Sequence, residues 1–272
     1  MVINPGPFHE FEHAGWEFIP DAYHNAFGEL TTQAIDALLD AVGVEGGVKL
    51  LDIASGPGYV AAAAAERGAT VVAIDFSRAM VSRAKKRFPA IEFREGNAEE
   101  LPFESCLFDA AVMNFGLLHL ARPEQALLEA HRVLRRRGRF AFTVWAAPQD
   151  AIAFGIVLRA VKAHGEPEVA LPEGPPFFRF SDAAECSRAL LAAGFKSFNV
   201  TKVKQAWRFP AGDWLFEAMK DATVRTAGLL RAQSPEASDK IRRAIREELE
   251  KYRKGERVAL PMPAILATAT KK

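Results

Sequence analysis

The feature that most constrains this chain is a regular alternation of short apolar runs and helical segments between Val48 and Trp145. Five runs have the length and near-continuous apolar content of strands buried on both faces. They cover residues 48–53, 70–74, 91–94, 110–113 and 139–145. Strands that alternate with helices form a parallel sheet, and right-handed crossovers place helices on both of its faces. The sequence therefore predicts a doubly wound α/β fold.

The remaining segments are mostly helical in their periodicity. Helices are expected at residues 20–27, about 31–42, 60–67, 77–88 and 123–134. Gly138 is expected to end the last of these, so that the basic run Arg135–Arg137 favours the helix dipole. After Ala146, helices are expected at 151–163, 183–193, 212–231 and 235–254, and strands at 195–207 and 257–270. We expect a mostly parallel, seven-stranded sheet with an antiparallel last strand and a helical cap.

The composition argues against several classes of partner. The chain has 35 basic and 34 acidic residues, so it lacks the positive field that neutralises nucleic-acid phosphates. Its two cysteines, Cys106 and Cys186, lack the CxxC spacing of a metal site. The N-terminal segment has no basic start followed by an apolar run, and the Ala-rich stretch 61–65 is too short to cross a bilayer. These features predict a cytoplasmic protein without a metal, a nucleic-acid partner or membrane insertion.

A glycine-rich segment, LLDIASGPGYVAA at residues 50–62, contains the first strand's end and the loop that follows it. Gly56 and Gly58 allow a tight turn and the close approach of a ligand to the main chain. Asp75 ends the second strand, where its carboxylate is placed to accept both hydroxyls of a ribose. The spacing also fits the fingerprint of dinucleotide-binding folds. These residues alone therefore leave two nucleoside-containing ligands open.

Asp52, at the end of the first strand, distinguishes between the two ligands. A carboxylate there repels an anionic pyrophosphate, but it attracts the ammonium of S-adenosylmethionine (SAM), directly or through water. The other interpretation is that Asp52 only accepts hydrogen bonds from loop N–H groups. A second polar loop follows the third strand, where Asn97 and the backbone of Ala98 are placed to bond with an adenine edge. Together the two loops favour SAM.

Five segments in this order resemble the broad family of SAM-dependent methyltransferases that includes the quinone-biosynthesis C-methyltransferases. They are LDIASGPGYVA, VVAIDFS, GNAEELPF, FDAAVMNFGLLHL and the helix at 124–134, and the resemblance covers residues 48–145. It implies a class I methyltransferase that uses SAM and leaves S-adenosylhomocysteine. Two positions depart from the family pattern. Ala54 stands where glycine is usual, which should tighten the turn, and Asn97 stands where aspartate is commoner.

The resemblance also implies a role for each matched segment. The glycine loop holds the methionine part of SAM, the end of the second strand holds the ribose, the second polar loop holds the adenine, and the end of the fourth strand lies near the methyl group. In that order, the expected cofactor-binding residues are Asp52, Ala54, Ser55, Gly56 and Gly58; Asp75 and Phe76; Asn97 and Ala98; and Asn114 and Phe115.

The residues that act on the methyl acceptor leave a weaker trace, because a sulfonium is already a good leaving group and a base is needed only if the acceptor loses a proton. His119, after the fourth strand, is the candidate base; alternatively it is a loop histidine bonded to the backbone. Tyr23, on an N-terminal helix, contacts cofactor or substrate, or simply packs. Phe178 and Arg179, in the stretch PPFFRF, line a substrate pocket or belong to the core.

We therefore expect a SAM-dependent methyltransferase for a small, apolar or aromatic molecule, and an oligomer is compatible with the sequence. Residues 1–47 form helices over the cofactor site, 48–146 form the SAM-binding core, and 147–272 complete the sheet and carry the cap on the substrate side. One alternative is an NAD(P)-binding oxidoreductase, but no Tyr-x-x-x-Lys pair follows the fourth strand. The other is a SAM-binding protein without catalysis, against which the intact loop argues.

Overall fold

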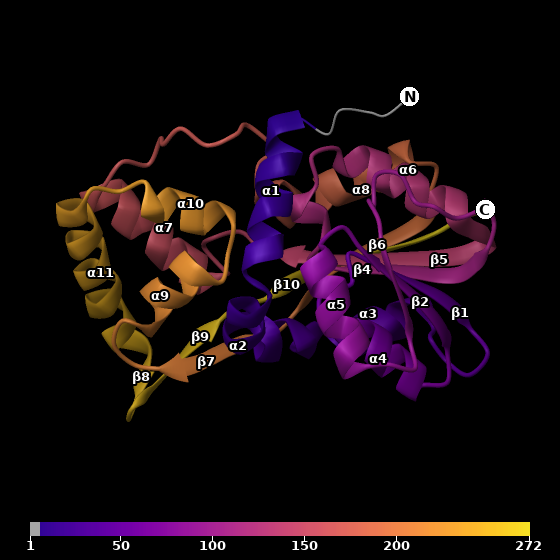
Figure 1. Ribbon diagram of the computed structural model, residues 1–272, viewed down its shortest axis with the longest axis horizontal. Coiled ribbons are helices and arrows are strands. Elements are labelled where there is room, and N and C mark those ends of the chain that lie inside the picture. The colour runs from indigo at the N-terminus through magenta and orange to yellow at the C-terminus, as the bar shows by residue number, and fades with distance from the viewer. Residues whose placement is uncertain (1–5) are drawn as a thin grey trace.

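The computed structural model describes residues 6–272 and contains the doubly wound sheet that the sequence predicts (Figure 1). Seven strands lie in the order β3-β2-β1-β4-β5-β10-β6. They are β1 (Lys49–Ile53), β2 (Thr70–Asp75), β3 (Glu92–Glu95), β4 (Phe108–Asn114), β5 (Leu134–Trp145), β6 (Lys196–Val203) and β10 (Ala264–Thr270). As expected, β10 is antiparallel to both of its neighbours, whereas the pairs from β3 to β5 are parallel. The strand order reverses between β1 and β4, which opens a crevice at their carboxyl ends.

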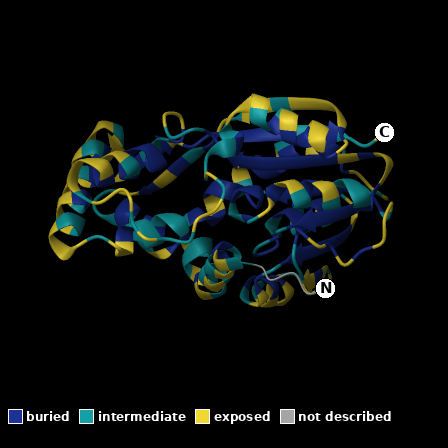
Figure 2. Ribbon diagram, turned by 90° about the horizontal axis from the view of Figure 1, so that it is seen from above, coloured by how far each residue is buried: buried dark blue, intermediate teal, exposed yellow. Residues whose placement is uncertain are grey.

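Helices cover both faces of this sheet. One face carries α3 (Ile35–Val42), α4 (Tyr59–Glu66) and α5 (Arg78–Arg87), and the other carries α6 (Pro123–Val133) and α8 (Ala183–Ala192). The helix α5 begins where the sequence predicts, because the hydroxyl of Ser77 accepts a hydrogen bond from the Met80 amide at 3.1 Å. Figure 2 shows buried central strands between helices whose outer sides are exposed. The core is therefore two apolar layers, one on each side of the sheet.

A second body stands beside the sheet and corresponds to the expected cap (Figure 1). It contains α7 (Ile152–His164), α9 (Trp214–Asp221), α10 (Arg225–Arg231), α11 (Pro235–Leu249), and a small antiparallel sheet of β7 (Ala206–Pro210), β9 (Arg257–Pro261) and β8 (Arg253–Lys254). The chain enters this body after β5 and again after β6. The cap is therefore not purely helical, and it is inserted between the last strands of the main sheet.

Two helices at the N-terminus lie between the cap and the sheet. The second, α2 (Pro20–Thr31), extends the expected helix by one turn. The first, α1 (Gly6–Phe18), was not expected from the sequence. It packs against α5 of the sheet domain, and its Gly15 lies so close to Val224 of the cap that a Cβ there would be 2.6 Å from a Val224 methyl carbon. The helix α1 thus touches both bodies.

Several expected boundaries are wrong. The helix α6 ends at Val133, so Arg135–Arg137 lie at the start of β5 and not at a helix end. The segment is a strand because its pairing with β4 overrides the helical pattern of the sequence. Within it, the Arg135 guanidinium pairs with the Asp109 carboxylate at 2.7 Å. The expected strand 195–207 is divided between two sheets, as is the strand 257–270, which Pro263 interrupts by lacking an N–H donor. The expected helix 212–231 is broken between α9 and α10, where the chain reaches the ligand site.

Candidate cofactor and acceptor site

A cavity of about 970 Å³, which includes its open mouth, lies at the carboxyl ends of β1, β2 and β4. Ten of the residues expected at the site line it: Tyr23, Ala54, Gly56, Asp75, Phe76, Asn97, Ala98, Asn114, Phe115 and His119. Five others do not: Asp52, Ser55, Gly58, Phe178 and Arg179. The fold therefore gathers segments that are far apart in the sequence around one cavity.

Asp75 joins the ends of the first two strands. Its Oδ2 accepts a hydrogen bond from the Gly56 amide at 2.8 Å, and its Oδ1 accepts one from the Ser77 amide at 2.9 Å. Burial raises the pKa of Asp75 to about 6, against the lowering effect of these two amides. Each carboxylate oxygen keeps a lone pair, so the group can still accept two ribose hydroxyls from the cavity.

Asp52 and Ser55 lie beneath the glycine loop. Asp52 has no exposed surface, and neither its carboxylate oxygens nor the Ser55 hydroxyl has a hydrogen-bond partner within residues 6–272. Burial raises the pKa of Asp52 well above its usual range, against the lowering effect of the Ala61 amide, and the nearby Asp75 raises the pKa further. Buried polar atoms without partners are rare. An ammonium group above the loop would favour the ionised form of this carboxyl group, whereas a pyrophosphate would disfavour it.

The backbone of the glycine loop has the left-handed conformation at three positions. Gly56 has a φ of +52° and Gly58 one of +86°. Ala54 has a φ of 54°, which is costly for a residue with a Cβ, so the glycine that is usual here in the family has a physical reason. Gly58 does not face the cavity, because a Cβ there would lie 2.7 Å from the Phe93 ring. Gly58 therefore shapes the turn, whereas Gly56 borders the cavity.

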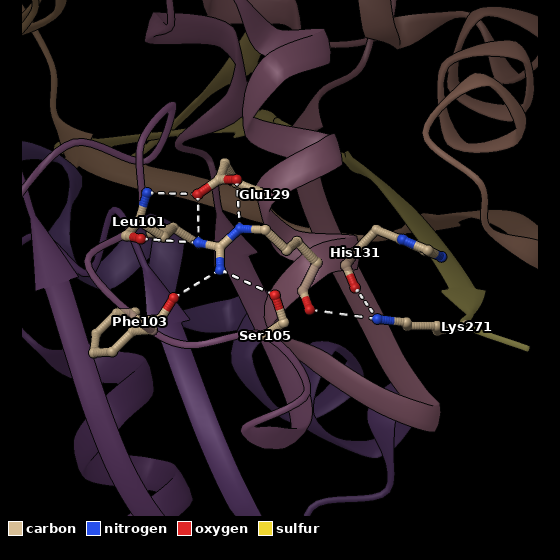
Figure 3. A network of polar contacts seen from close by, with 7 residues as sticks. Leu101, Phe103, Ser105, Glu129, His131 and Lys271 are labelled. Atoms are coloured by element: carbon tan, nitrogen blue, oxygen red, sulfur yellow. Dashed lines mark hydrogen bonds and ion pairs between the residues drawn. The ribbon is translucent and has the colours of Figure 1, made fainter. Parts of the chain in front are cut away.

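The loop after β3 is anchored to α6 by a network of polar contacts (Figure 3). The Arg132 guanidinium donates to the carbonyl oxygens of Leu101 at 2.9 Å and Phe103 at 2.7 Å. It also pairs with Glu129 at 2.7 Å, and Glu129 accepts from the Leu101 amide at 2.8 Å. These bonds fix a loop that has little regular structure of its own.

Asn97 and Ala98 begin this loop and line the cavity. The Asn97 Oδ1 accepts a hydrogen bond from the Glu99 amide at 2.9 Å, and the buried Glu99 carboxylate accepts from the amide and Nε of Arg122 at 2.9 and 2.7 Å. The Asn97 Nδ2 makes no hydrogen bond with any residue from 6 to 272. It remains available to donate to an adenine ring nitrogen.

Asn114 ends β4 and links three segments. Its Nδ2 donates to the Thr31 carbonyl at 3.2 Å, and its Oδ1 accepts from the Thr143 hydroxyl at 2.6 Å. The next residue, Phe115, has a φ of 55° and stacks on Trp145 with 4.1 Å between ring centroids. Both side chains are therefore held by their neighbours where they border the cavity.

Aromatic side chains form the far wall of the cavity. They come from both N-terminal helices, the end of β4, β5, the cap and the loop before α8, and are Trp16, Tyr23, Phe27, Phe115, Trp145, Phe154 and Phe177. Burial raises the pKa of Tyr23 to about 12, and its hydroxyl donates to the Thr31 Oγ1 at 3.4 Å. Tyr23 therefore stays neutral at physiological pH. This wall suits a flat, apolar molecule.

The structure does not bring Phe178 and Arg179 to this cavity. Phe177 lines it instead, and Phe178 packs beside it against Phe154. The turn η3 (Arg179–Ser181) directs Arg179 to Glu124 at 2.6 Å and Glu185 at 3.1 Å. One ring of the aromatic stretch thus borders the cavity while its neighbour packs behind it, and the local turn decides which ring does so.

His119 lies at the cavity, in the turn η2 (Leu117–His119). Its Nδ1 contacts the Glu12 Oε2 at 3.0 Å, and the Glu12 Oε1 accepts from the Arg225 Nε at 2.9 Å. Neither Glu12 nor Arg225 was expected from the sequence. Glu12 left one signal, since it shares a face of α1 with the buried Phe8 at i, i+4 spacing. Arg225 left none.

Within residues 6–272, no group of three or more His, Cys, Asp or Glu side chains is arranged to hold a metal ion. Cys106 is exposed and Cys186 is buried, and both are free. Burial raises the pKa of the Cys186 thiol to about 12, so it is unreactive. No helix in the described part of the chain is long and apolar enough to cross a membrane.

Residues 51–142, which contain the glycine loop and the strands β2 to β4, match the family described as methyltransferase domain. A curated relative, the demethylmenaquinone methyltransferase of Paenarthrobacter aurescens, is 40% identical over 111 residues, which are 41% of this chain and 44% of that enzyme. The chain therefore spans less than half the length of that relative.

Solved structures resemble a larger part of the chain. The YcgJ protein of Bacillus subtilis has a TM-score of 0.56 with 20% identity, over 88% of this chain and 98% of that one. The [4+2]-cyclase SpnF has a TM-score of 0.53 with 21% identity, over 88% of this chain and 81% of that one. At these identities the structures agree in fold, and the fold is shared with a protein that is named for another reaction.

Proposed function

We propose that the chain binds SAM in this cavity and transfers its methyl group to a small, apolar, aromatic molecule. The observation that carries the proposal is that one cavity runs from Asp75 to the aromatic wall. A nucleoside at the polar end and a flat acceptor at the apolar end would share the space. Alignment of two reactants in a site from which water is excluded accounts for much of the acceleration of such a transfer.

At the polar end, we assign the residues as the sequence predicts. Asp75 holds the ribose, with Phe76 beside it. Asn97 and Ala98 hold the adenine. The loop from Ala54 to Gly58 receives the methionine part, and the unpartnered carboxylate of Asp52 lies beneath its ammonium. Asn114 and Phe115 border the space near the methyl group.

At the acceptor end, we propose that His119 removes the proton that the acceptor loses. The Nε2 of His119 makes no hydrogen bond with a residue of the described chain, and its ring borders the cavity. SAM supplies an electrophilic methyl carbon and departs as the thioether S-adenosylhomocysteine. The acceptor's electron pair forms the new bond to that carbon while His119 holds the released proton.

We further propose that residues 1–47 cover the cofactor, that 48–146 are the SAM-binding core, and that the segment 147–272 sets the acceptor. The cap supports this division, because Phe154 and the break between α9 and α10 border the aromatic end. We propose that the protein acts in the cytoplasm on a small molecule. We do not propose a nucleic-acid partner, because the net charge of the chain is only +1. An oligomer is compatible with this assignment.

A ligand-binding experiment tests the cofactor assignment. SAM and S-adenosylhomocysteine should raise the melting temperature, whereas NAD and NADP should not. Stabilisation by NAD alone would overturn the proposal in favour of an oxidoreductase.

An acceptor screen tests the reaction. Release of S-adenosylhomocysteine should be measured with a short-chain demethylmenaquinol, naphthols and other phenols. We expect turnover with at least one of them, and His119→Gln should abolish it while SAM still binds. Tight SAM binding with no turnover on any acceptor would favour a binding protein.

A further inference from the structure

Glu12 is a fully buried carboxylate on α1, with 0% of its surface exposed. It accepts hydrogen bonds from the Trp16 Nε1 at 3.1 Å and the Arg225 Nε at 2.9 Å, and its Oε2 lies 3.0 Å from the His119 Nδ1. Burial tends to raise its pKa, but the charges and hydrogen bonds of His119 and Arg225 prevail and lower the pKa. Glu12 is therefore ionised at neutral pH, and an ionised carboxylate only accepts hydrogen bonds.

The three donors have a common location. Trp16, His119 and Arg225 all line the cavity, whereas Glu12 does not. They come from α1, η2 and the start of α10, which are separated by more than 100 residues in the sequence. A single carboxylate behind the wall therefore orients three side chains that face the acceptor. A buried charge is costly unless it is paired and hydrogen-bonded, and these three side chains meet that requirement for Glu12.

The carboxylate determines which nitrogen of His119 carries the proton. Because an ionised Glu12 can only accept, the His119 Nδ1 is the donor in this contact, so the neutral ring has its proton on Nδ1 and a lone pair on Nε2. The Arg225 guanidinium balances the charge of Glu12 from the other side, donates through Nη1 to the Pro175 carbonyl at 2.7 Å, and stacks on Phe8 at 4.3 Å. Because arginine is always charged, Arg225 remains a charged partner of Glu12 when the His119 ring is neutral.

The helix that carries Glu12 also packs beside the cofactor residues. The Ser77 hydroxyl donates to the Trp16 carbonyl at 3.2 Å, and the Ala79 amide donates to the Glu17 carboxylate at 3.3 Å. Ser77 is also a donor to Asp75. The packing of α1 against the residues near Asp75 thus also places Glu12 beside His119.

We propose that Glu12 is a positioning residue that holds His119 as the Nδ1–H tautomer, and that the acceptor is an oxygen or carbon acid, such as a phenol or quinol. This inference rests on the proposed function. In the step it implies, the acceptor's O–H or C–H bond breaks and its proton passes to the His119 Nε2. The electron pair left on the acceptor forms a bond to the methyl carbon, as the carbon–sulfur bond breaks and its electrons stay on sulfur. An acceptor that has no proton to lose would not need this arrangement.

The tautomer can be measured without an acceptor. We would record long-range ¹H–¹⁵N spectra of histidine-labelled protein at about pH 8.5, where unpaired histidines are neutral, and assign His119 with the variant His119→Asn. We expect the Nδ1–H form in the wild type, and its loss in Glu12→Gln. Glu10→Gln, an exposed change on the same helix, should leave the spectrum unchanged. An Nε2–H ring or a doubly protonated ring in the wild type would overturn the proposal, even if Glu12→Gln does not fold.

The acceptor class is tested with matched probes, a naphthol and the corresponding dimethylaminonaphthalene. Turnover of the naphthol that falls about 100-fold in Glu12→Gln, with the KM for SAM unchanged, agrees with a positioning residue for a general base. Turnover of the tertiary amine alone would overturn the acceptor class. Calorimetry with S-adenosylhomocysteine separates the two proposals: absence of binding overturns the proposed function, whatever tautomer the spectrum shows.

Discussion

The Asp75 Oδ2 and the Gly56 amide are 2.8 Å apart, and this hydrogen bond ties the glycine loop after β1 to the end of β2. The bond places the Asp75 carboxylate and the Gly56 main chain next to each other at the cavity. The register of the parallel pair, in which Ile53 lies opposite Ile74, brings the two strand ends level. The site that we propose for the ribose is thus preorganised by the sheet itself.

The first prediction concerns that carboxylate. Asp75→Ala should weaken SAM binding by about 2–3 kcal/mol, because two charge-assisted hydrogen bonds to the ribose are lost. That change corresponds to a dissociation constant about 30- to 150-fold larger. Isothermal titration calorimetry measures it. An unchanged dissociation constant would show that Asp75 is not the ribose ligand.

The second prediction is a pH dependence. Burial raises the pKa of Asp75 from 3.8 to about 6, so the folded protein holds a proton there that the unfolded chain has lost. Between about pH 4 and pH 6, the contribution of Asp75 to the unfolding free energy therefore falls as pH rises. Ribose hydroxyls need the ionised form, so SAM affinity should fall as pH drops through about 6, and be about tenfold weaker at pH 5 than at pH 7.5.

The control for this pH dependence is Asp75→Asn, which keeps the shape but does not titrate. Its S-adenosylhomocysteine affinity should be low and nearly flat over the same range. If the wild type is as flat as this variant, then ionisation of Asp75 does not control cofactor binding.

A pair of glycine variants separates ligand space from turn geometry. A Cβ on Gly56 meets no atom within 4 Å, whereas a Cβ on Gly58 would lie 2.7 Å from the Phe93 ring. Gly56→Val should therefore abolish S-adenosylhomocysteine binding, while the core folds with a loss of about 1–2 kcal/mol from its left-handed backbone. Gly58→Val should be much less stable. Melting temperatures and calorimetry measure both, and wild-type binding by Gly56→Val would contradict the assigned cavity.

A further prediction concerns the loop after β3, which we propose to hold the adenine and which Arg132 anchors. Arg132→Met leaves two loop carbonyls and Glu129 without their donor, which should cost about 1–3 kcal/mol in the unfolding free energy and weaken cofactor binding. Arg135→Met is the matched control, because its pair with Asp109 is exposed and such pairs contribute about 0–1 kcal/mol. Denaturant titration and calorimetry compare them. Equal losses in both variants would show that the network does not hold the loop.

Much of the cofactor end could be predicted from the sequence, because each part of it is local. Asp75 ends a strand, and the glycines and Asn97 lie within a few residues of a strand end; parallel strands bring these carboxyl ends to one edge. A strand assignment therefore fixes the location of the residue after it. Asp52 shows the limit of this reasoning, since its sequence position did not reveal that the folded chain leaves its oxygens without a partner.

The acceptor end was less predictable, because small shifts in backbone direction decide it. The sequence marked the aromatic stretch before α8, but the turn η3 directs Arg179 away and leaves Phe177 at the cavity. Helical periodicity across 212–231 likewise concealed the break after Asp221 that exposes Arg225 to the site. Helical periodicity is a signal averaged over many residues, whereas a break in a helix depends on the conformation of only two or three residues.

By itself, the sequence determined the order of strands and helices, the loop conformations that need glycine, and the charge at the end of each strand, because these depend on neighbours along the chain. Only the tertiary structure decided that Glu12, His119 and Arg225 meet. A buried carboxylate, a loop histidine and a helix-start arginine are each ordinary alone. Their contacts span 107 and 213 residues, and only the packing of α1 between the sheet and the cap brings them within hydrogen-bonding distance.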